Sequence, residues 1–218
     1  MGYTANDFAS RSDVSRETLE GFRRWQSLLE KWNAKINLVS PTTVGDFWER
    51  HALDSWQVVE RMPESVTNTI DLGSGAGFPG IAIAIALKQR GRGRALMVEA
   101  AGKKASFLRT VVRELDLPCD VTSERAERLP AQGFDLVSTR AFAPLPRLLA
   151  YAHPFWKSDT VGLFLKGERL NQEIAEASGD WSFESRTYPS QSSATGHILE
   201  VRGLCKRSPD TVSPTKLS

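Results

Sequence analysis

The sequence predicts an α/β fold in which a mostly parallel sheet is covered by helices on both faces. Three observations support this prediction. Short apolar runs alternate with helix-like stretches, which is the pattern of strand–helix–strand units. A glycine-rich loop follows the first apolar run, and the last two apolar runs have no helix between them. The earlier apolar runs end at Asp71, Glu99, Ser123, Thr139 and Lys166.

Helix-like stretches separate most of these runs, at residues 80–88, 103–115, 145–152 and 168–177. Two final strand candidates, over residues 181–188 and 197–202, follow each other directly. Because parallel neighbours need a long crossover connection, we expect these two strands to pair antiparallel at one edge of the sheet.

The pattern of apolar residues over 1–64 predicts a helical cap that precedes the α/β domain. Apolar residues recur at helical spacing over 15–33 and again over 44–59, and Pro63 ends the second pattern. We place the α/β domain at 65–205 and expect a disordered polar tail at 206–218. Four tryptophans on the apolar faces are expected to form the core of the cap: Trp25, Trp32, Trp48 and Trp56.

The composition favours a soluble cytoplasmic protein without a metal site. No stretch approaches the roughly 20 consecutive apolar residues that span a bilayer, and the polar start lacks the apolar core of a signal peptide. Two cysteines, Cys119 and Cys205, are too few for a disulfide framework, and no Cys/His cluster has zinc spacing. The net charge of +2 does not by itself indicate a nucleic-acid partner.

The glycine loop after the first strand is the first place to expect a ligand. In open α/β sheets, ligands bind at the carboxyl ends of the strands where the strand order reverses. Gly73, Gly75 and Gly77 form a G-x-G-x-G pattern. Gly75, Gly77 and Gly80 form G-x-G-x-x-G, the dinucleotide fingerprint.

Two further observations favour S-adenosylmethionine over a nicotinamide dinucleotide. Asp71 stands two residues before the first glycine, where its carboxylate can accept a hydrogen bond from an ammonium group but would repel a pyrophosphate. No G-K-[ST] follows the glycines, so the phosphate-binding P-loop is absent. Glu99 at the end of the second strand can hold ribose hydroxyls of either cofactor, and an NAD-dependent oxidoreductase stays the alternative.

The loop after the fourth strand, residues 138–144, restricts the methyl acceptor. It lacks the Asn/Asp-Pro-Pro-aromatic turn used for exocyclic amines, and it contains no histidine that could serve as a base. Carbon methylation of a pyrimidine needs a cysteine nucleophile, but Cys119 precedes the wrong strand and is expected to be buried and inert. A ring nitrogen such as guanine N7 has a free lone pair, so positioning alone can supply most of the rate.

Several segments together resemble one family, the 16S ribosomal RNA guanine-N7 methyltransferases, also called glucose-inhibited division protein B. They occur in family order. The segments are KWNAKINLVS (31–40), RHALDSW (50–56), DLGSGAGFPGI (71–81), EAAGKKASFLRTV (99–111), SERAERLP (123–130), FDLVSTRAFAPL (134–145), LFLKG (163–167) and HILEVR (197–202).

The resemblance implies a class I methyltransferase fold, with a seven-stranded sheet and an N-terminal helical extension. It implies methyl transfer from S-adenosylmethionine to N7 of one guanine in the 530 loop of 16S rRNA, within the small ribosomal subunit or a precursor. We expect a monomer. Glu99 would hold the ribose, although the family often has Asp there, and Thr139 stands where Ser is commoner. The other implied cofactor contacts are Gly73, Phe78, Ala126, Glu127 and Arg140.

Arg140 and Phe142 are candidates at the reacting centre, although no catalytic residue is assigned. A guanidinium beside the cationic sulfonium would hinder transfer, so we expect Arg140 to pair with the methionine carboxylate or an RNA phosphate. Phe142 either stacks on an extruded base or belongs to the core. A non-catalytic RNA-binding protein on this fold is a second alternative, but Asp71, Glu99 and Arg140 are intact.

Basic residues near the predicted site have two interpretations. Lys103, Lys104 and Lys166 are candidates for an RNA-facing rim, and a solvated helix face is the alternative for the first two. His51, Asp54 and Ser55 lie at turn spacing on one helix. We interpret these three first as a hydrogen-bonded set that joins the cap to the core, and second as a site wall.

Overall fold

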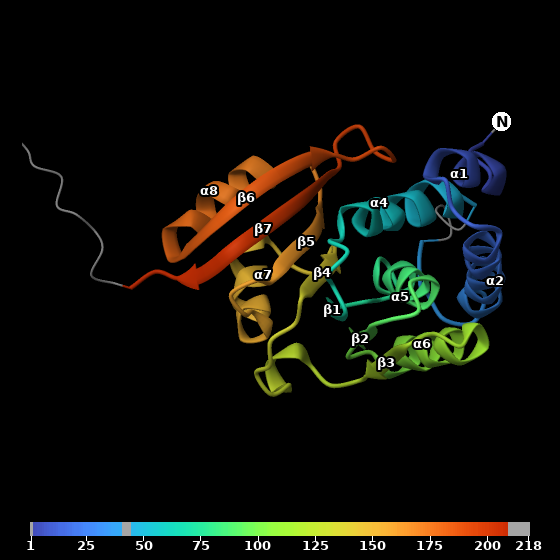
Figure 1. Cartoon of the computed structure of the whole chain (residues 1–218), viewed down its shortest axis with the longest axis horizontal. Helices are drawn as coiled ribbons and strands as arrows, with labels where there is room; N and C mark the ends of the chain where they lie inside the picture. Colours follow the sequence, from blue (N-terminus) through green and yellow to red (C-terminus); the bar gives the residue numbers. More distant parts are fainter. Residues whose placement is uncertain (1, 41–44, 209–218) are drawn as a thin grey trace, which may run out of the picture.

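The computed structural model describes residues 2–40 and 45–208, and Figure 1 shows their arrangement. They form a seven-stranded sheet with the order β3-β2-β1-β4-β5-β7-β6, which confirms the predicted α/β class. Strands β1 to β5 pair in parallel, whereas β7 runs antiparallel to both β5 and β6. The strands are β1 (Asn68–Leu72), β2 (Arg94–Val98), β3 (Cys119–Thr122), β4 (Leu136–Arg140), β5 (Val161–Lys166), β6 (Trp181–Pro189) and β7 (His197–Lys206).

The order of the strands places the glycine loop where a ligand is expected. β1 lies between β2 and β4, so the chain moves outward in one direction after β1 and in the other direction after β3. The loop that follows β1 therefore lies at the point where the strand order reverses. The carboxyl ends of β1, β2 and β4 meet at this edge of the sheet.

Helices cover both faces of the sheet (Figure 1). α5 (Gly80–Gln89) and α6 (Gly102–Leu115) contribute to one hydrophobic cluster, and α7 (Leu145–Ala152) and α8 (Leu170–Asp180) to the other. α5 is buried along most of its length because the N-terminal helices pack over its outer side. This burial explains its almost purely apolar sequence, GIAIAIALKQ, since a helix that is apolar all round needs cover all round.

The N-terminal helices share a core cluster with α5 and α6. α2 (Arg16–Asn33) confirms the predicted first helix, and the side chain of Ser15 caps its start. The second predicted helix is a π-helix, η1 (Phe47–Leu53), that continues as α4 (Asp54–Arg61); residues 41–44 lie outside the described residues. The N-terminal helices together enclose an aromatic core, which contains Phe8, Phe22, Trp25, Phe47, Trp48 and Trp56.

Other boundaries differ from the sequence prediction. α1 (Ala5–Ser12) was not predicted because it is short and polar, although Thr4 and Asp7 form a reciprocal capping box at its start. β7 extends to Lys206, the first residue of the predicted tail, because it pairs along its whole length with β6. Residues 209–218 of that tail lie outside the described residues. Within the described chain, no helix is both long and apolar enough to cross a membrane.

Candidate functional site

The glycine loop adopts positive φ angles that favour glycine, and it leaves one side open. Gly73, Gly75 and Gly77 have φ values of +67°, +58° and +97°. A Cβ on Gly73 would lie 2.3 Å from Cδ2 of Phe142, and a Cβ on Gly77 would lie 2.2 Å from Cδ1 of Ile81. A Cβ on Gly75 would meet no atom closer than 3.9 Å. The backbone at Gly75 is therefore the part of the loop that a ligand can approach closely.

Asp71 supports this loop from beneath. Its side chain is buried, and Oδ1 accepts a hydrogen bond of 2.7 Å from the Ser138 hydroxyl. Oδ2 lies at the start of α5, where a Cβ on Gly80 would be 2.7 Å away. Burial raises the pKa of Asp71 to about 6, against opposing hydrogen bonds. The predicted contact with an ammonium group stays a prediction, since this carboxylate faces the interior.

Glu99 joins the glycine loop to the start of α6. Oε2 accepts a hydrogen bond of 2.9 Å from the amide of Gly75, and Oε1 accepts one of 2.8 Å from the amide of Ala101. A carboxylate has about four acceptor positions, so Glu99 can hold ribose hydroxyls while it keeps these bonds. Its place directly against the open part of the loop supports the predicted role.

A short 3-10 helix, η2 (Ala126–Arg128), is linked to the glycine loop through the aromatic side chains of Tyr151 and Phe142. The amide of Glu127 and, to a lesser extent, the Tyr151 hydroxyl lower the pKa of Glu127. The ring of Tyr151 lies 5.2 Å from that of Phe142, which in turn covers Gly73. Because η2 follows β3 and the glycine loop follows β1, these predicted cofactor residues lie at the same edge of the parallel strands.

The side chain of Phe78 points away from the open side of the loop. Its ring is buried, stacks on His51 at 4.4 Å between centroids, and lies 4.7 Å from Trp25. The guanidinium carbon of Arg140 lies 4.5 Å from the centre of the same ring. A ligand contact from Phe78 would therefore come from its backbone, while its ring joins the N-terminal helices to the sheet.

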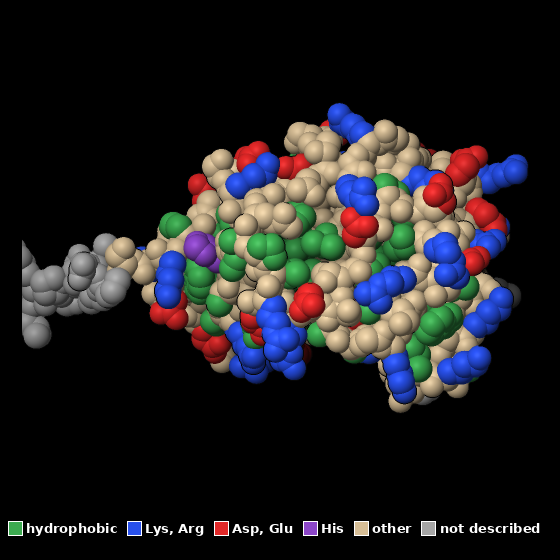
Figure 2. All heavy atoms as spheres, turned by 90° about the horizontal axis from the view of Figure 1, so that it is seen from below, with side chains coloured by type: hydrophobic (Ala, Val, Ile, Leu, Met, Phe, Trp, Pro, Cys, Tyr) green, Lys and Arg blue, Asp and Glu red, His purple; other side chains and the backbone are tan. Residues whose placement is uncertain are grey.

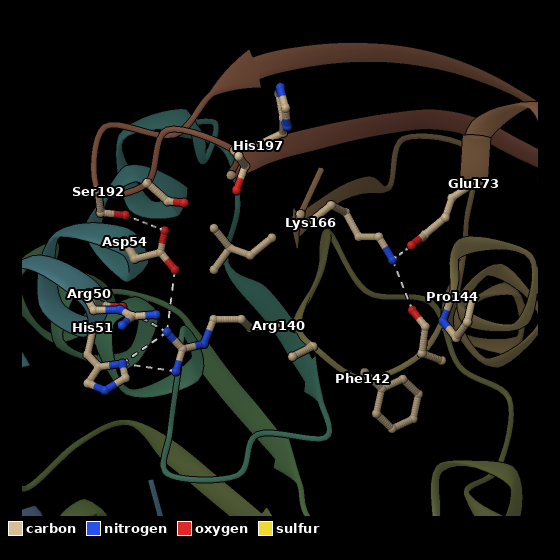
Figure 3. Close-up of a pocket in the computed structure, with 17 residues that line it drawn as sticks. Arg50, His51, Asp54, Arg140, Phe142, Pro144, Lys166, Glu173, Ser192 and His197 are labelled. Carbon is tan, nitrogen blue, oxygen red and sulfur yellow. Dashed lines mark hydrogen bonds and ion pairs between the residues drawn. The ribbon is translucent and has the colours of Figure 1, made fainter. Parts of the chain in front are cut away.

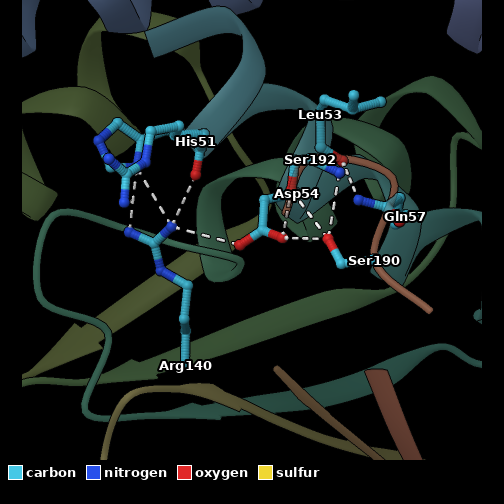
Figure 4. Close-up of polar contacts among 8 residues, drawn as sticks. His51, Leu53, Asp54, Gln57, Arg140, Ser190 and Ser192 are labelled. Carbon is cyan, nitrogen blue, oxygen red and sulfur yellow. Dashed lines mark hydrogen bonds and ion pairs between the residues drawn. The ribbon is translucent and has the colours of Figure 1, made fainter. Parts of the chain in front are cut away.

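Arg140 lies at the end of β4 and is held by the N-terminal helices (Figure 4). Nη1 donates to the Arg50 carbonyl at 3.0 Å, lies 3.1 Å from Nδ1 of His51, and forms an ion pair of 3.5 Å with Asp54. Burial lowers the pKa of Arg140, and the carboxylate of Asp54 opposes this shift. His51 and Asp54 thus bear out two of the three members of the set that was predicted to join the cap to the core. Ser55 is fully buried and takes no part in these contacts.

A cavity of about 700 Å³ opens beside Arg140 and Phe142 (Figure 3). Its walls come from segments that are far apart in the sequence: the start of α4, the loop after β4, the end of β5 and the loop between β6 and β7. This volume suits a small ligand or a single extruded base. The sequence prediction missed the β6–β7 wall, whose residues are small and polar: Ser192, Ser193, Thr195, Gly196 and, at the start of β7, His197.

Lys166 lies in the cavity wall but is already engaged. Its ammonium group forms an ion pair with Glu173 and donates a hydrogen bond of 3.0 Å to the Ala143 carbonyl. Glu173 also accepts a hydrogen bond of 2.8 Å from the amide of Leu145. The pair therefore holds the loop after β4 on both sides of Pro144. The predicted phosphate contact of Lys166 stays a prediction, and it would compete with this pairing.

Lys103 and Lys104 lie in the first turn of α6. Within the described part of the chain, neither ammonium group forms an ion pair or a hydrogen bond, so both are available to an external anion. Figure 2 shows Lys and Arg spread over one face of the molecule, with Asp and Glu between them and hydrophobic side chains exposed. Positive charge does not gather into one patch on that face.

The comparisons with known proteins identify the family. A family model described as "GidB: rRNA small subunit methyltransferase G" matches residues 18–199, which is most of the chain. The chain belongs to this methyltransferase family. Two relatives named "Ribosomal RNA small subunit methyltransferase G" support the assignment. The one from Hyphomonas neptunium is 43% identical over 92% of this chain and 95% of its own. The one from Parvibaculum lavamentivorans is 44% identical over 92% and 89%.

Solved structures confirm the class I methyltransferase fold expected for this family. A SAM-dependent methyltransferase from Aquifex aeolicus superposes with a TM-score of 0.57 at 11% identity, over 79% of this chain and 96% of that chain. A fibrillarin/Nop5p complex gives 0.54 at 15% identity, over 70% and 81%. At these identities the likeness concerns the fold alone.

Cys119 is a structural residue in this member of the family. It is the first residue of β3, is buried, and lies outside the set of residues that line the cavity. Burial raises the pKa of its thiol to about 12, so almost no thiolate exists near neutral pH. The prediction of a buried Cys119 is confirmed.

Proposed function

We propose that the chain transfers a methyl group from S-adenosylmethionine to N7 of a single guanine in the 530 loop of 16S rRNA. The membership of the family supports rRNA of the small subunit as substrate. The observation that supports a single base as the methyl acceptor is the cavity beside Arg140 and Phe142. This cavity is large enough for one base and adjoins the glycine loop.

The residues at the glycine loop fit the cofactor. Gly75 leaves an open backbone surface, and Glu99 lies against it with its carboxylate. S-adenosylmethionine, when bound there, supplies an electrophilic methyl group that the lone pair of N7 accepts without loss of a proton. The chain's own residues then need to position the base, exclude water and keep extra positive charge away from the reacting atoms.

The cavity wall suits such an acceptor. Its two carboxylates are paired with cations, Asp54 with Arg140 and Glu173 with Lys166. An acceptor that must lose a proton would need a base from this wall, either one of these paired carboxylates or one of the two histidines, His51 and His197, whereas N7 needs none. Phe142 stands between the glycine loop and the cavity, where its ring can stack on the base.

Arg140 is proposed to bind an anion, either the methionine carboxylate or an RNA phosphate. Its charge is partly balanced by Asp54 and the Arg50 carbonyl, which keeps a cation close to the site without a free positive charge at the reacting centre. We expect Arg140→Ala to lose most activity and to weaken the binding of cofactor or RNA. Unchanged kinetics and cofactor affinity in this variant would exclude the role.

The substrate must present its guanine outside a helix. N7 lies in the major groove of A-form RNA, which is deep and narrow, so an unpaired or extruded guanine is required. We propose that the small ribosomal subunit or a precursor presents it, and that the protein acts as a monomer in the cytoplasm. Initial rates on naked 16S rRNA, precursor particles and mature subunits test which form is the substrate.

Mapping of N7-methylguanine in 16S rRNA, from cells with and without the active gene, tests the function directly. The proposal predicts one methylated guanine in the 530 loop that disappears without the gene. An unchanged map, or loss of a mark elsewhere, would contradict it. Calorimetric titrations with S-adenosylmethionine and with NAD distinguish the proposed methyltransferase from an NAD-dependent oxidoreductase. Transfer of a labelled methyl group to ribosomal subunits distinguishes it from a non-catalytic RNA-binding protein.

A further inference from the structure

Asp54 contacts two segments of the cavity wall that are far apart in the sequence (Figure 4). Oδ2 forms the ion pair of 3.5 Å with Nη1 of Arg140, at the end of β4. Oδ1 accepts hydrogen bonds from the hydroxyls of Ser192, at 2.8 Å, and Ser190, at 3.3 Å, in the loop between β6 and β7. One carboxylate therefore joins Arg140 to two serines that lie 136 and 138 residues after Asp54 in the chain.

The β6–β7 loop, defined here as residues 190–196, forms one wall of the cavity. Inside the loop, Ser190 and Ser192 share a hydrogen bond of 2.9 Å between their hydroxyls, and the amide of Ser192 donates to Ser190 Oγ at 3.2 Å. A second tether joins the amide of Gln191 to Oε1 of Gln57 at 2.8 Å. The loop is thus held to α4 at neighbouring positions, and only the Asp54 tether also touches Arg140.

The burial of this contact makes it effective. The side chains of Arg140 and Asp54 are 23% and 16% exposed, so solvent screens their attraction less than it screens a surface pair. In the described part of the chain, Asp54 is the one carboxylate within 4 Å of Arg140. Loss of the serine hydroxyls would free the carboxylate to turn, and the guanidinium would lose its fixed anion.

We propose that Asp54 is a positioning residue that couples closure of the β6–β7 loop over the cavity to the orientation of Arg140. The inference rests on the proposed function, because of the two anions proposed for Arg140 it takes the methionine carboxylate of the methyl donor. The two effects are thermodynamically linked. If closure of the loop raises the affinity of a ligand at Arg140 by some factor, binding of that ligand raises the closed-to-open ratio of the loop by the same factor. The cavity would then close around the acceptor when the methyl donor is in place.

Amide hydrogen exchange of the β6–β7 loop, with and without S-adenosylmethionine, tests the coupling. In the wild-type protein we expect the cofactor to slow exchange at Ser192. In a variant with both Ser190→Ala and Ser192→Ala, the cofactor should no longer slow exchange in the loop, although neither serine touches Arg140. Ser193→Ala is the matched control, since Ser193 lies in the same loop and has no hydrogen bond to Asp54; it should keep the cofactor-dependent protection.

Asp54→Asn separates the two contacts. Its amide oxygen can still accept from a serine, but the neutral side chain offers no charge to Arg140. We expect loop protection without cofactor to stay close to wild type, and the affinity for S-adenosylmethionine to fall on the order of tenfold, as for one lost charge-assisted hydrogen bond. In steady state this appears as a raised cofactor KM with a smaller change in kcat. A merely structural role would instead increase exchange throughout α4.

The outcomes distinguish this inference from the proposed function. If calorimetry finds no binding of S-adenosylmethionine to the wild-type protein, the proposed function fails. If the cofactor binds but leaves exchange of the loop unchanged, or if the double serine variant keeps full protection and affinity, the coupling alone is overturned. The serine variants carry the test even if substitution of Asp54 prevents folding.

Discussion

Alanine at Gly75 should separate cofactor binding from stability. Gly75 has a φ of +58°, and a Cβ there would meet no atom closer than 3.9 Å. Gly77 has a φ of +97°, and a Cβ there would lie 2.2 Å from Ile81. Gly203, in β7, has a φ of +59° and nothing within 4 Å of an added Cβ. Gly203 is therefore a matched control for backbone strain away from the glycine loop.

The structure gives the size of each effect on the free energy of unfolding. A left-handed backbone costs an alanine about 1–2 kcal/mol, so Gly75→Ala and Gly203→Ala should both lose about that much. Gly77→Ala must also displace Ile81, which adds about 1–3 kcal/mol of overpacking. For a chain of this size, each kcal/mol lowers Tm by about 2–4 °C. Scanning calorimetry should therefore rank Gly77→Ala clearly below the other two variants.

Titration calorimetry with S-adenosylmethionine then tests the site. The methyl group of Gly75→Ala would project into the open side of the loop, where we place the cofactor, and should weaken binding by at least tenfold, about 1.4 kcal/mol. Gly203→Ala should bind the cofactor as the wild type does. Equal affinity of the two variants would refute the reasoning, because the open side of Gly75 would then not face the cofactor.

Three further outcomes follow from the structure. The pKa of Asp71 is raised from 3.8 to about 6, so its contribution to stability is full below pH 3.8 and is lost as the pH rises through 6. Asp71→Asn should abolish that loss, which amounts to about 2 kcal/mol between pH 4 and pH 7 and is measured by urea unfolding at both; parallel pH profiles of variant and wild type would contradict it. Alanine at both Lys103 and Lys104 should lower the slope of log affinity for rRNA against log salt by about 2, whereas an unchanged slope excludes phosphate contacts. Iodoacetamide should alkylate exposed Cys205 in the native protein and spare buried Cys119, as mass spectrometry of the peptides would show; equal labelling would contradict the burial.

The features that sequence reasoning predicted well depend on neighbours in the chain. Helix 16–33 and the glycine loop follow from local spacing, since apolar periodicity and positive φ are properties of short segments. The sequence did not predict α1, because this helix has one buried residue, Phe8, and therefore no apolar periodicity. Its signal was the capping box of Thr4 and Asp7 alone.

The features that sequence reasoning missed depend on partners that are distant in the chain. Lys166 was predicted to face RNA, and only the packing of α8 against the end of β5 shows that Glu173 is its partner. Phe78 was predicted to contact the cofactor, and only the tertiary structure shows that its ring packs against His51 and the guanidinium of Arg140. In each case the side chain contacts a residue that is distant in the sequence, and no local sequence pattern predicts such a contact.

By itself, the sequence determined the α/β class, the glycine loop at which we place the cofactor and the resemblance that the family match confirmed. Each depends on residues within a short stretch or on the order of such stretches. Only the tertiary structure showed the cavity beside Arg140 and the contacts that Asp54 makes with Arg140 and with the β6–β7 loop. The walls of that cavity join residue 54 to residue 192, and contacts across such separations exist only after the sheet has placed both segments at one edge.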